Sequence, residues 1–101
     1  MDLGRPLVDV HINGTIFSHT LMDLGATINV MTKDSMLKLK LQGSLRKATI
    51  VLQLVDHSIL TPEGIVEDVM VSIDSWEYPT DFLVLQHKAK LTGYPLILRK
   101  P

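Results

Sequence analysis

The dipeptide Asn13-Gly14 constrains the fold most, because it lies between two runs of β-forming residues. From Leu7 to Ile12 apolar and polar residues alternate, and from Thr15 to Met22 β-branched and aromatic residues recur at period two. Such alternation is typical of a strand with one buried face. Asn-Gly favours the two-residue turn of a tight antiparallel hairpin. The sequence therefore predicts a β-hairpin in this part of the chain.

Further β-forming runs follow, and turn residues separate them. Asp56-His57-Ser58 and Pro62-Glu63-Gly64 are turn-forming, so they divide the middle of the chain into short strands. Up to Leu41 the apolar spacing predicts one short helix, with Thr32 as its N-cap and Gly43 as its stop signal. The other expected strands cover residues 26–31, 48–55, 59–73 with one interruption, 81–85 and 94–98. We therefore expect a mainly β domain, closed or sandwiched, with one short helix.

Composition bounds the organisation and the partners of the chain. Its 101 residues, 46% of them apolar, fit a single globular domain over residues 1–101. Ten Lys and Arg against eleven Asp and Glu give a formal charge of -1, so no overall field attracts nucleic acid. Nucleic-acid binding stays a minor hypothesis that depends on the densest basic segment, which contains Lys33, Lys38, Lys40, Arg46 and Lys47.

Other residue patterns argue against metal and membrane functions. The chain has no cysteine, and its four histidines share no metal-ligand spacing, so we expect no disulfide, metal or other cofactor. No apolar run reaches the roughly 20 residues that span a bilayer, and residues 1–6 lack the apolar core of a signal peptide. We expect an intracellular, cytoplasmic protein without a membrane partner. The aromatic residues Trp76, Tyr78 and Phe82 are expected to pack the core or line a subsite.

The residues Leu21-Met22-Asp23-Leu24-Gly25-Ala26 carry the main functional signal. Two apolar residues lead into a carboxylate, and the glycine and small residue beyond it permit a tight turn. Alone this pattern is common, and Asp2-Leu3-Gly4 repeats it in the same chain. The segment that follows directly, Thr27-Ile28-Asn29-Val30-Met31, makes the pattern specific.

With its later motifs, the chain resembles the protease domain of gypsy-type long-terminal-repeat retrotransposons, particularly those of plants. The later motifs are LQLVDHSI at 52–59, PEGIVEDV at 62–69 and YPTDFLVL at 78–85. The resemblance extends in order and spacing over about residues 7–98. It implies a closed β-barrel of the retropepsin (acid protease) type with a flap hairpin, which acts as a homodimer without a cofactor.

The resemblance also implies which residues form the site. Asp23 would be the catalytic carboxylate of each subunit, on an active-site turn that contains Leu24, Gly25, Ala26 and Thr27. A flap that binds an extended polypeptide substrate would contain Val55, Asp56, His57, Ser58 and Ile59. A late apolar motif contains Ile97 and Leu98. The implied function is an aspartic endopeptidase of a retrotransposon polyprotein.

The chain departs from the family pattern at three places. Leu24 replaces the threonine that bonds across the dimer in better-known retropepsins, and leucine has neither donor nor acceptor. Arg99 follows the late motif where the family has glycine. We also expect the family's C-terminal helix and dimer strand to be missing from residues 1–101. These departures keep a second function open: a catalytically decayed or truncated retropepsin-like module that acts in protein binding or dimerisation.

Overall fold

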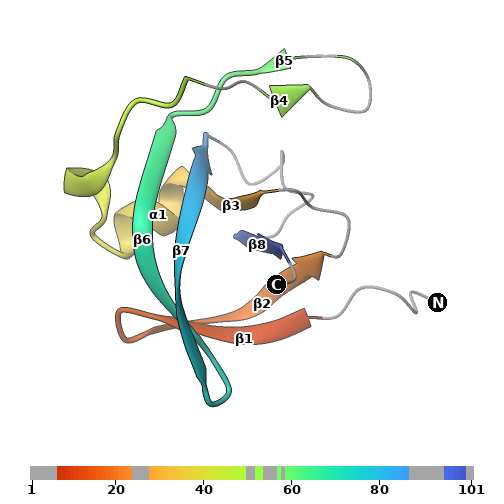
Figure 1. The fold of residues 1–101 in the computed structure, drawn as a ribbon, viewed down its shortest axis with the longest axis vertical. Helices are drawn as coiled ribbons and strands as arrows, with labels where there is room; N and C mark the ends of the chain where they lie inside the picture. The colour runs from red at the N-terminus through yellow and green to blue at the C-terminus, as the bar shows by residue number, and fades with distance from the viewer. Residues whose placement is uncertain are drawn as a thin grey trace.

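Figure 1 shows the fold in a computed structural model, which describes residues 7–23, 28–49, 52–53, 57, 59–86 and 95–99. Short strands dominate, with one α-helix and one 3₁₀ helix among them. In chain order the elements are β1 (Leu7–Ile12), β2 (Thr15–Asp23), β3 (Asn29–Thr32), α1 (Lys33–Lys38), η1 (Gln42–Ser44), β4 (Leu52–Gln53), β5 (Ile59–Leu60), β6 (Gly64–Ile73), β7 (Trp76–Leu85) and β8 (Leu96–Arg99).

Six of the strands form one strongly curled sheet. Their order around the sheet is β1-β2-β8-β3-β7-β6, and β1 meets β6 through the pair His11 and Ser72, so the sheet closes into a barrel. β4 and β5 form a separate two-stranded sheet. The expected mainly β, closed-barrel fold with one short helix is confirmed.

The first hairpin forms where the sequence predicts it. Asn13 and Gly14 have φ angles of 50° and 77°, and Ile12 pairs with Thr15 on either side of them. Positive φ at both turn residues is what a type I′ turn requires, and its twist matches that of the flanking strands. Local turn chemistry therefore sets the register of β1 against β2 from Ile12 back to Val10, before an irregularity between Val8 and Val10 shifts it.

The helix α1 begins at its predicted cap but ends earlier than predicted. The Thr32 hydroxyl accepts a hydrogen bond from the Ser35 N–H at 3.1 Å. At the other end Lys40 has a φ of 58°, and the N–H groups of Lys40 and Leu41 donate to the carbonyls of Leu37 and Met36, both at 3.0 Å. This is a Schellman ending, made by a lysine in the left-handed region where glycine is usual. The prediction that Gly43 stops the helix was wrong.

The predicted bounds differ most from the structure at two strands. β7 begins at Trp76, five residues before the predicted strand at 81–85, and runs through Pro79. Proline has no N–H to donate to a neighbouring strand. β3 pairs with β7 only at residues 82–85, so Pro79 has a described neighbouring strand on one side only, where it faces Met70 of β6. In the middle of the chain, residues 48–49 of the predicted strand at 48–55 belong to no strand, and β4 covers Leu52–Gln53; its residues 50–51 and 54–55 lie outside the described residues.

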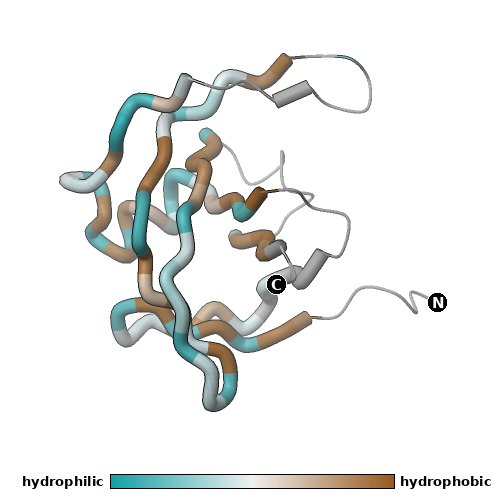
Figure 2. Tube along the Cα trace, in the orientation of Figure 1, coloured by the Kyte–Doolittle hydropathy of each residue, from teal (hydrophilic) through white to brown (hydrophobic). Residues whose placement is uncertain are grey.

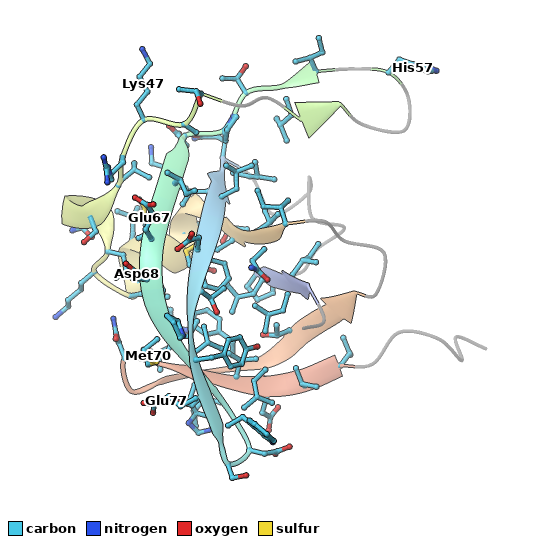
Figure 3. All side chains as sticks on the ribbon, in the orientation of Figure 1. Lys47, His57, Glu67, Asp68, Met70 and Glu77 are labelled. Carbon is cyan, nitrogen blue, oxygen red and sulfur yellow. The ribbon has the colours of Figure 1, made fainter. Side chains whose placement is uncertain are left out.

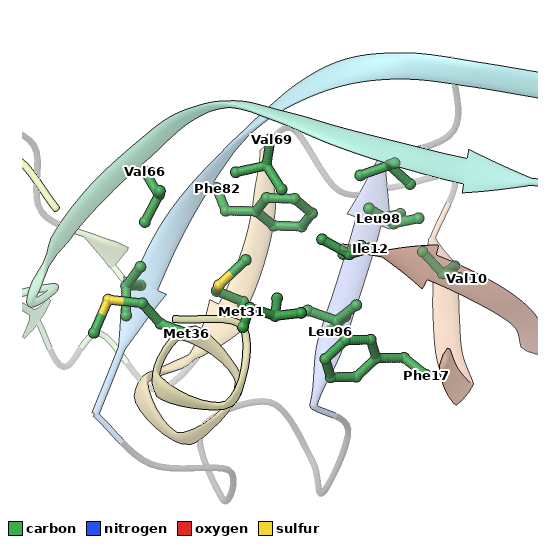
Figure 4. Close-up of a cluster of buried hydrophobic side chains, with 13 residues drawn as sticks. Val10, Ile12, Phe17, Met31, Met36, Val66, Val69, Phe82, Leu96 and Leu98 are labelled. Atoms are coloured by element: carbon green, nitrogen blue, oxygen red, sulfur yellow. The ribbon is translucent and has the colours of Figure 1, made fainter. Parts of the chain in front are cut away.

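The apolar residues of the strands and of α1 meet inside the barrel. Brown and teal stretches alternate along β6 in Figure 2, whereas the end of β7 is continuously brown because its last four residues are apolar and buried. In Figure 4, Phe82 lies between Val69 and Met31 at the centre of the cluster. Its buried members are Val10, Ile12, Phe17, Met31, Met36, Leu39, Val66, Val69, Val71, Phe82, Val84, Leu96 and Leu98.

The three aromatic residues of the last third have different environments. Phe82 is fully buried, and Tyr78 packs against the core cluster, as expected. Trp76 is 76% exposed, so of its two expected places the core was wrong, and a place in a subsite stays a prediction. It begins β7 opposite Ile73, next to the β6–β7 turn, whereas β3 pairs with β7 only further along, at residues 82–85. Its position in the hairpin, not its hydrophobicity, determines its exposure.

Candidate active site

The barrel holds the strand that ends at Asp23 against the last strand of the sheet. β8 lies between β2 and β3: it runs parallel to β2, with Asp23 opposite Arg99, and antiparallel to β3. Ile97 pairs with Leu21 on one side and Val30 on the other. Neighbouring strands are roughly 4.8 Å apart, so β2 and β3 are separated by about two such spacings. The end of β2 and the start of β3 therefore lie on either side of β8.

Only part of the predicted active-site turn lies within the described structure. Asp23 is described as the last residue of β2, through its backbone register. Leu24, Gly25, Ala26 and Thr27 lie outside the described residues, so their assignment to the turn stays a prediction. Ile97 and Leu98, the predicted late apolar motif, lie in β8, directly beside β2.

The N-terminus of α1 holds the start of β8 in place. The Thr32 N–H donates to the Pro95 carbonyl at 3.1 Å, and the Ser35 hydroxyl donates to the same carbonyl at 3.3 Å. The two hydroxyls are 2.9 Å apart and buried, so each is satisfied in this network. Thr32 was predicted as an N-cap, but the contact of Ser35 with Pro95 was missed. No sequence signal indicates it, since the two residues are 60 positions apart.

Ile97 faces away from the main core, toward a second apolar cluster. Successive strand residues point to opposite sides, so Leu96 and Leu98 enter the barrel core while Ile97 packs on the other side. There it meets a pair of buried residues, Val30 and Leu85. Two further side chains pack against that pair, Ile28 and Leu60. This second cluster joins β3, β7, β8 and β5, and it includes a predicted site residue.

The predicted flap corresponds to the connection between β4 and β5. The two strands pair antiparallel, Leu52 with Leu60 and Gln53 with Ile59, so the chain reverses between them. His57 and Ile59 are exposed, the latter by 69%, and Figure 3 shows His57 pointing away from the sheet. Val55, Asp56 and Ser58 lie outside the described residues. In Figure 1, β4 and β5 project from one end of β6, on the side toward which β2 runs.

Leu60 was not among the predicted flap residues, although it connects the β4–β5 sheet to the barrel. It lies one residue beyond Ile59 and therefore on the opposite face of β5. Ile59 faces solvent, whereas Leu60 packs against the second cluster. Both residues are apolar, so the sequence carries no signal that distinguishes the exposed Ile59 from the packed Leu60.

The described side chains add little charge chemistry to the barrel interior. Burial raises the pKa of Tyr78 above its ordinary value of 10.0. The buried Oη of Tyr78 and Oγ1 of Thr80 have no hydrogen-bond partner among the described residues. Among the described residues, no group of three or more His, Asp or Glu could hold a metal ion. Within the same residues, no helix is long and apolar enough to cross a membrane.

The fold as a whole resembles that of a known protease-like domain. The chain matches the crystal structure of the retroviral protease-like domain of Ddi1 from Leishmania major, with a TM-score of 0.74 and 18% sequence identity. The match covers 97% of this chain and 74% of that one. The chain has a retropepsin-like fold. No protein-family model and no curated protein matches the sequence.

Proposed function

We propose that this chain is an aspartic endopeptidase domain that acts as a homodimer, with Asp23 of each subunit as its catalytic carboxylate. The observation that carries the proposal is the position of Asp23 at the end of β2, where β2 pairs with β8 inside a retropepsin-like fold. A strand end that is backed by a barrel core offers a rigid support for a reacting group. The second cluster supports the same end of the barrel, because it packs on β3 and β8.

The proposed chemistry needs two carboxylates in one site. Two Asp groups about 3 Å apart cannot both ionise, so they share one proton and titrate as a pair. The ionised member takes a proton from the attacking water, and the protonated member hydrogen-bonds the carbonyl oxygen of the scissile peptide. One chain supplies one Asp23, so dimerisation brings the pair together. No cofactor takes part in this reaction.

The proposed substrate is an extended polypeptide of a retrotransposon polyprotein, held between the Asp23 pair and the β4–β5 hairpin. The exposed Ile59 supports peptide binding, because a hairpin with an apolar side chain and free strand edges can bind an extended chain by strand-like hydrogen bonds. The retrotransposon context depends on the motifs around residues 21–31, 52–59, 62–69 and 78–85.

The test combines mass in solution with peptide cleavage at mildly acidic pH. We expect the wild-type chain to cleave members of a peptide library in a concentration-dependent manner, and Asp23→Asn to lose this activity. The matched control is Asp74→Asn, in the β6–β7 turn, because asparagine adopts its φ of 54° as readily as aspartate does. Equal cleavage by Asp23→Asn and the wild type would show that Asp23 is not the catalytic group.

A second candidate function is a module that binds or dimerises without hydrolysis. Arg99 favours it, because this residue pairs with Asp23 in the ladder where the family pattern has glycine. Leu24 favours it as well, since it has no hydrogen-bonding group. This candidate predicts dimers or peptide complexes in solution without cleavage. It also predicts that the double variant Leu24→Thr, Arg99→Gly gains measurable cleavage. If the double variant were as inactive as the wild type, Leu24 and Arg99 would not be the cause of the missing hydrolysis.

A further inference from the structure

The segments that lead into β4 and out of β5 meet at one point on the barrel. The Arg46 N–H donates to the Ile65 carbonyl at 2.9 Å, and the Ile65 N–H donates to the Arg46 carbonyl at 2.8 Å. This reciprocal pair is an isolated antiparallel bridge outside the named ladders. Because both polar groups of Ile65 point to Arg46, they make no bonds to β7. The bridge therefore belongs to the base of the hairpin, not to the barrel ladder.

Gly64 makes this close approach possible. A Cβ on residue 64 would overlap the carbonyl oxygen of Arg46, and it would lie 2.8 Å from Cδ1 of Leu45. The oxygen is a backbone atom and cannot turn away as a flexible side chain could. Even an alanine at this position would push residues 45 and 46 away from β6, and the two hydrogen bonds of the bridge would lengthen or break.

Further contacts hold the same junction to the barrel. The Glu63 N–H donates to the Val84 carbonyl of β7 at 2.8 Å, which ties down the chain just before Gly64. Leu45 packs against the main core cluster, next to Arg46. The Arg46 guanidinium and the Glu67 carboxylate are 3.0 Å apart, but both side chains are exposed. We expect the backbone contacts to hold the junction together, because exposed ion pairs contribute little to stability.

We propose that Gly64 and the Arg46–Ile65 bridge form an anchor that positions the β4–β5 hairpin for peptide binding. The hairpin needs such an anchor, because the two described residue pairs of β4 and β5 are too few to be stable alone. Leu60 holds β5 against the second cluster, and the anchor holds the incoming segment. The role in peptide binding rests on the proposed peptidase function, whereas the mechanical role does not. Gly64 is thus a positioning residue.

Hydrogen exchange tests the mechanical role without any need for activity. In Gly64→Ala we expect the amides of Ile65 and of β4 and β5 to exchange about tenfold faster, while those of β1 and β2 keep the wild-type rate. The matched control is Gly43→Ala, because a Cβ on residue 43 would meet no atom within 4 Å. Exchange in Gly64→Ala that matches the Gly43→Ala control would overturn the proposal.

A second pair of variants keeps the test decisive if Gly64→Ala loosens the whole barrel. Arg46→Pro removes the N–H that donates to Ile65, and Leu45 with ψ of 126° already has the extended conformation that precedes proline. Arg46→Ala removes the ion pair but keeps this N–H. Faster exchange of the β4 and β5 amides in Arg46→Pro, but not in Arg46→Ala, would support the anchor. If the β1 and β2 amides of Arg46→Pro exchanged faster to the same extent, the contact would belong to the barrel and the proposal would be overturned.

Peptide kinetics then test the positioning role. We expect Gly64→Ala and Arg46→Pro to raise KM about tenfold and to leave kcat within about twofold, because the hairpin binds substrate and transition state alike. Gly43→Ala and Arg46→Ala should keep the wild-type KM. An equal loss of kcat in all four variants would overturn the positioning role. An unchanged KM in Gly64→Ala and Arg46→Pro would overturn it as well. A wild-type chain that cleaves no peptide would refute the proposed function, and the exchange experiment would still decide the anchor.

Discussion

The barrel and the β4–β5 hairpin are held together by different means. β6 and β7 share a ladder that runs from Gly64 with Val84 to Ile73 with Trp76, and its inward side chains are buried in the core. In the hairpin the described ladder has two pairs, and Leu60 packs against buried residues of the second cluster. The barrel is stabilised by its core, whereas the hairpin depends on its few attachments to the barrel.

Because of this difference, we expect global stability to depend on the barrel and the proposed substrate binding to depend on the hairpin. Local opening free energies range from near zero in poorly packed segments to the global value in a core. Substitutions in the barrel should therefore change the free energy of global unfolding. Those in the hairpin should change local opening and peptide binding while the barrel stays folded.

The largest effect is expected from Phe82→Ala, which breaks the barrel side of the comparison. Phe82 is fully buried at the centre of the main cluster, and its truncation leaves a cavity between Val69 and Met31. We expect the free energy of unfolding to fall by about 3–5 kcal/mol. Urea denaturation followed by circular dichroism measures this loss. A loss below about 1 kcal/mol would mean that the core relaxes around the site.

A smaller effect is expected from Leu60→Ala, which acts on the hairpin side. Leu60 is only partly buried, so we expect a loss of about 1–2 kcal/mol, below the range for a fully buried leucine. Exchange of the β5 amides should become faster, while that of β1 and β2 stays the same. Uniformly faster exchange would show that the second cluster belongs to the cooperative barrel.

Tyr78→Phe should stabilise the barrel by about 1 kcal/mol, because the buried hydroxyl has no partner among the described residues and its removal ends a desolvation cost.

The pKa of Tyr78 is raised by burial, so at a pH above the ordinary tyrosine value of 10.0 the folded chain keeps a proton that the unfolded chain loses. Wild-type stability should thus fall as the pH rises above 10, and this contribution should be absent from Tyr78→Phe. Denaturation at pH 8 and pH 10.5 tests both statements, and parallel curves for the two proteins would contradict the second.

The smallest effect on stability is expected from Ile59→Thr, which sharpens the hairpin side. Ile59 is 69% exposed, so its loss should change the free energy of unfolding by less than about 0.5 kcal/mol. Under the proposed function, KM for an extended peptide should nevertheless rise. An unchanged KM would separate Ile59 from substrate binding.

Features that depend on neighbouring residues could be predicted from the sequence. Asn13-Gly14 specifies its own turn, and Thr32 caps its own helix, so both predictions are confirmed. Lys40 is different, since its left-handed φ depends on a Schellman ending that lysine does not normally favour. The strand through Pro79 depends on which side of β7 is paired, and only the sheet order decides that.

The candidate site shows the same division. Ile97 and Leu98 could be located as strand residues and Asp23 directly after a strand, but periodicity does not indicate that β8 lies between β2 and β3. Gly64 was interpreted as part of a turn, and its contact with Arg46 depends on a bridge between residues 19 positions apart. Long-range pairing of this kind leaves no trace in local composition. The catalytic role of Asp23 stays a prediction.

The place of β8 also determines when the site can form during synthesis. β2 and β3 are made early, but the strand that lies between them is made more than 60 residues later. Until β8 emerges from the ribosome, the strand that pairs with the facing edges of β2 and β3 is missing. Such late, non-local pairing slows folding and leaves strand edges exposed in the nascent chain. A nascent chain should therefore lack the assembled site until its last described strand has been translated.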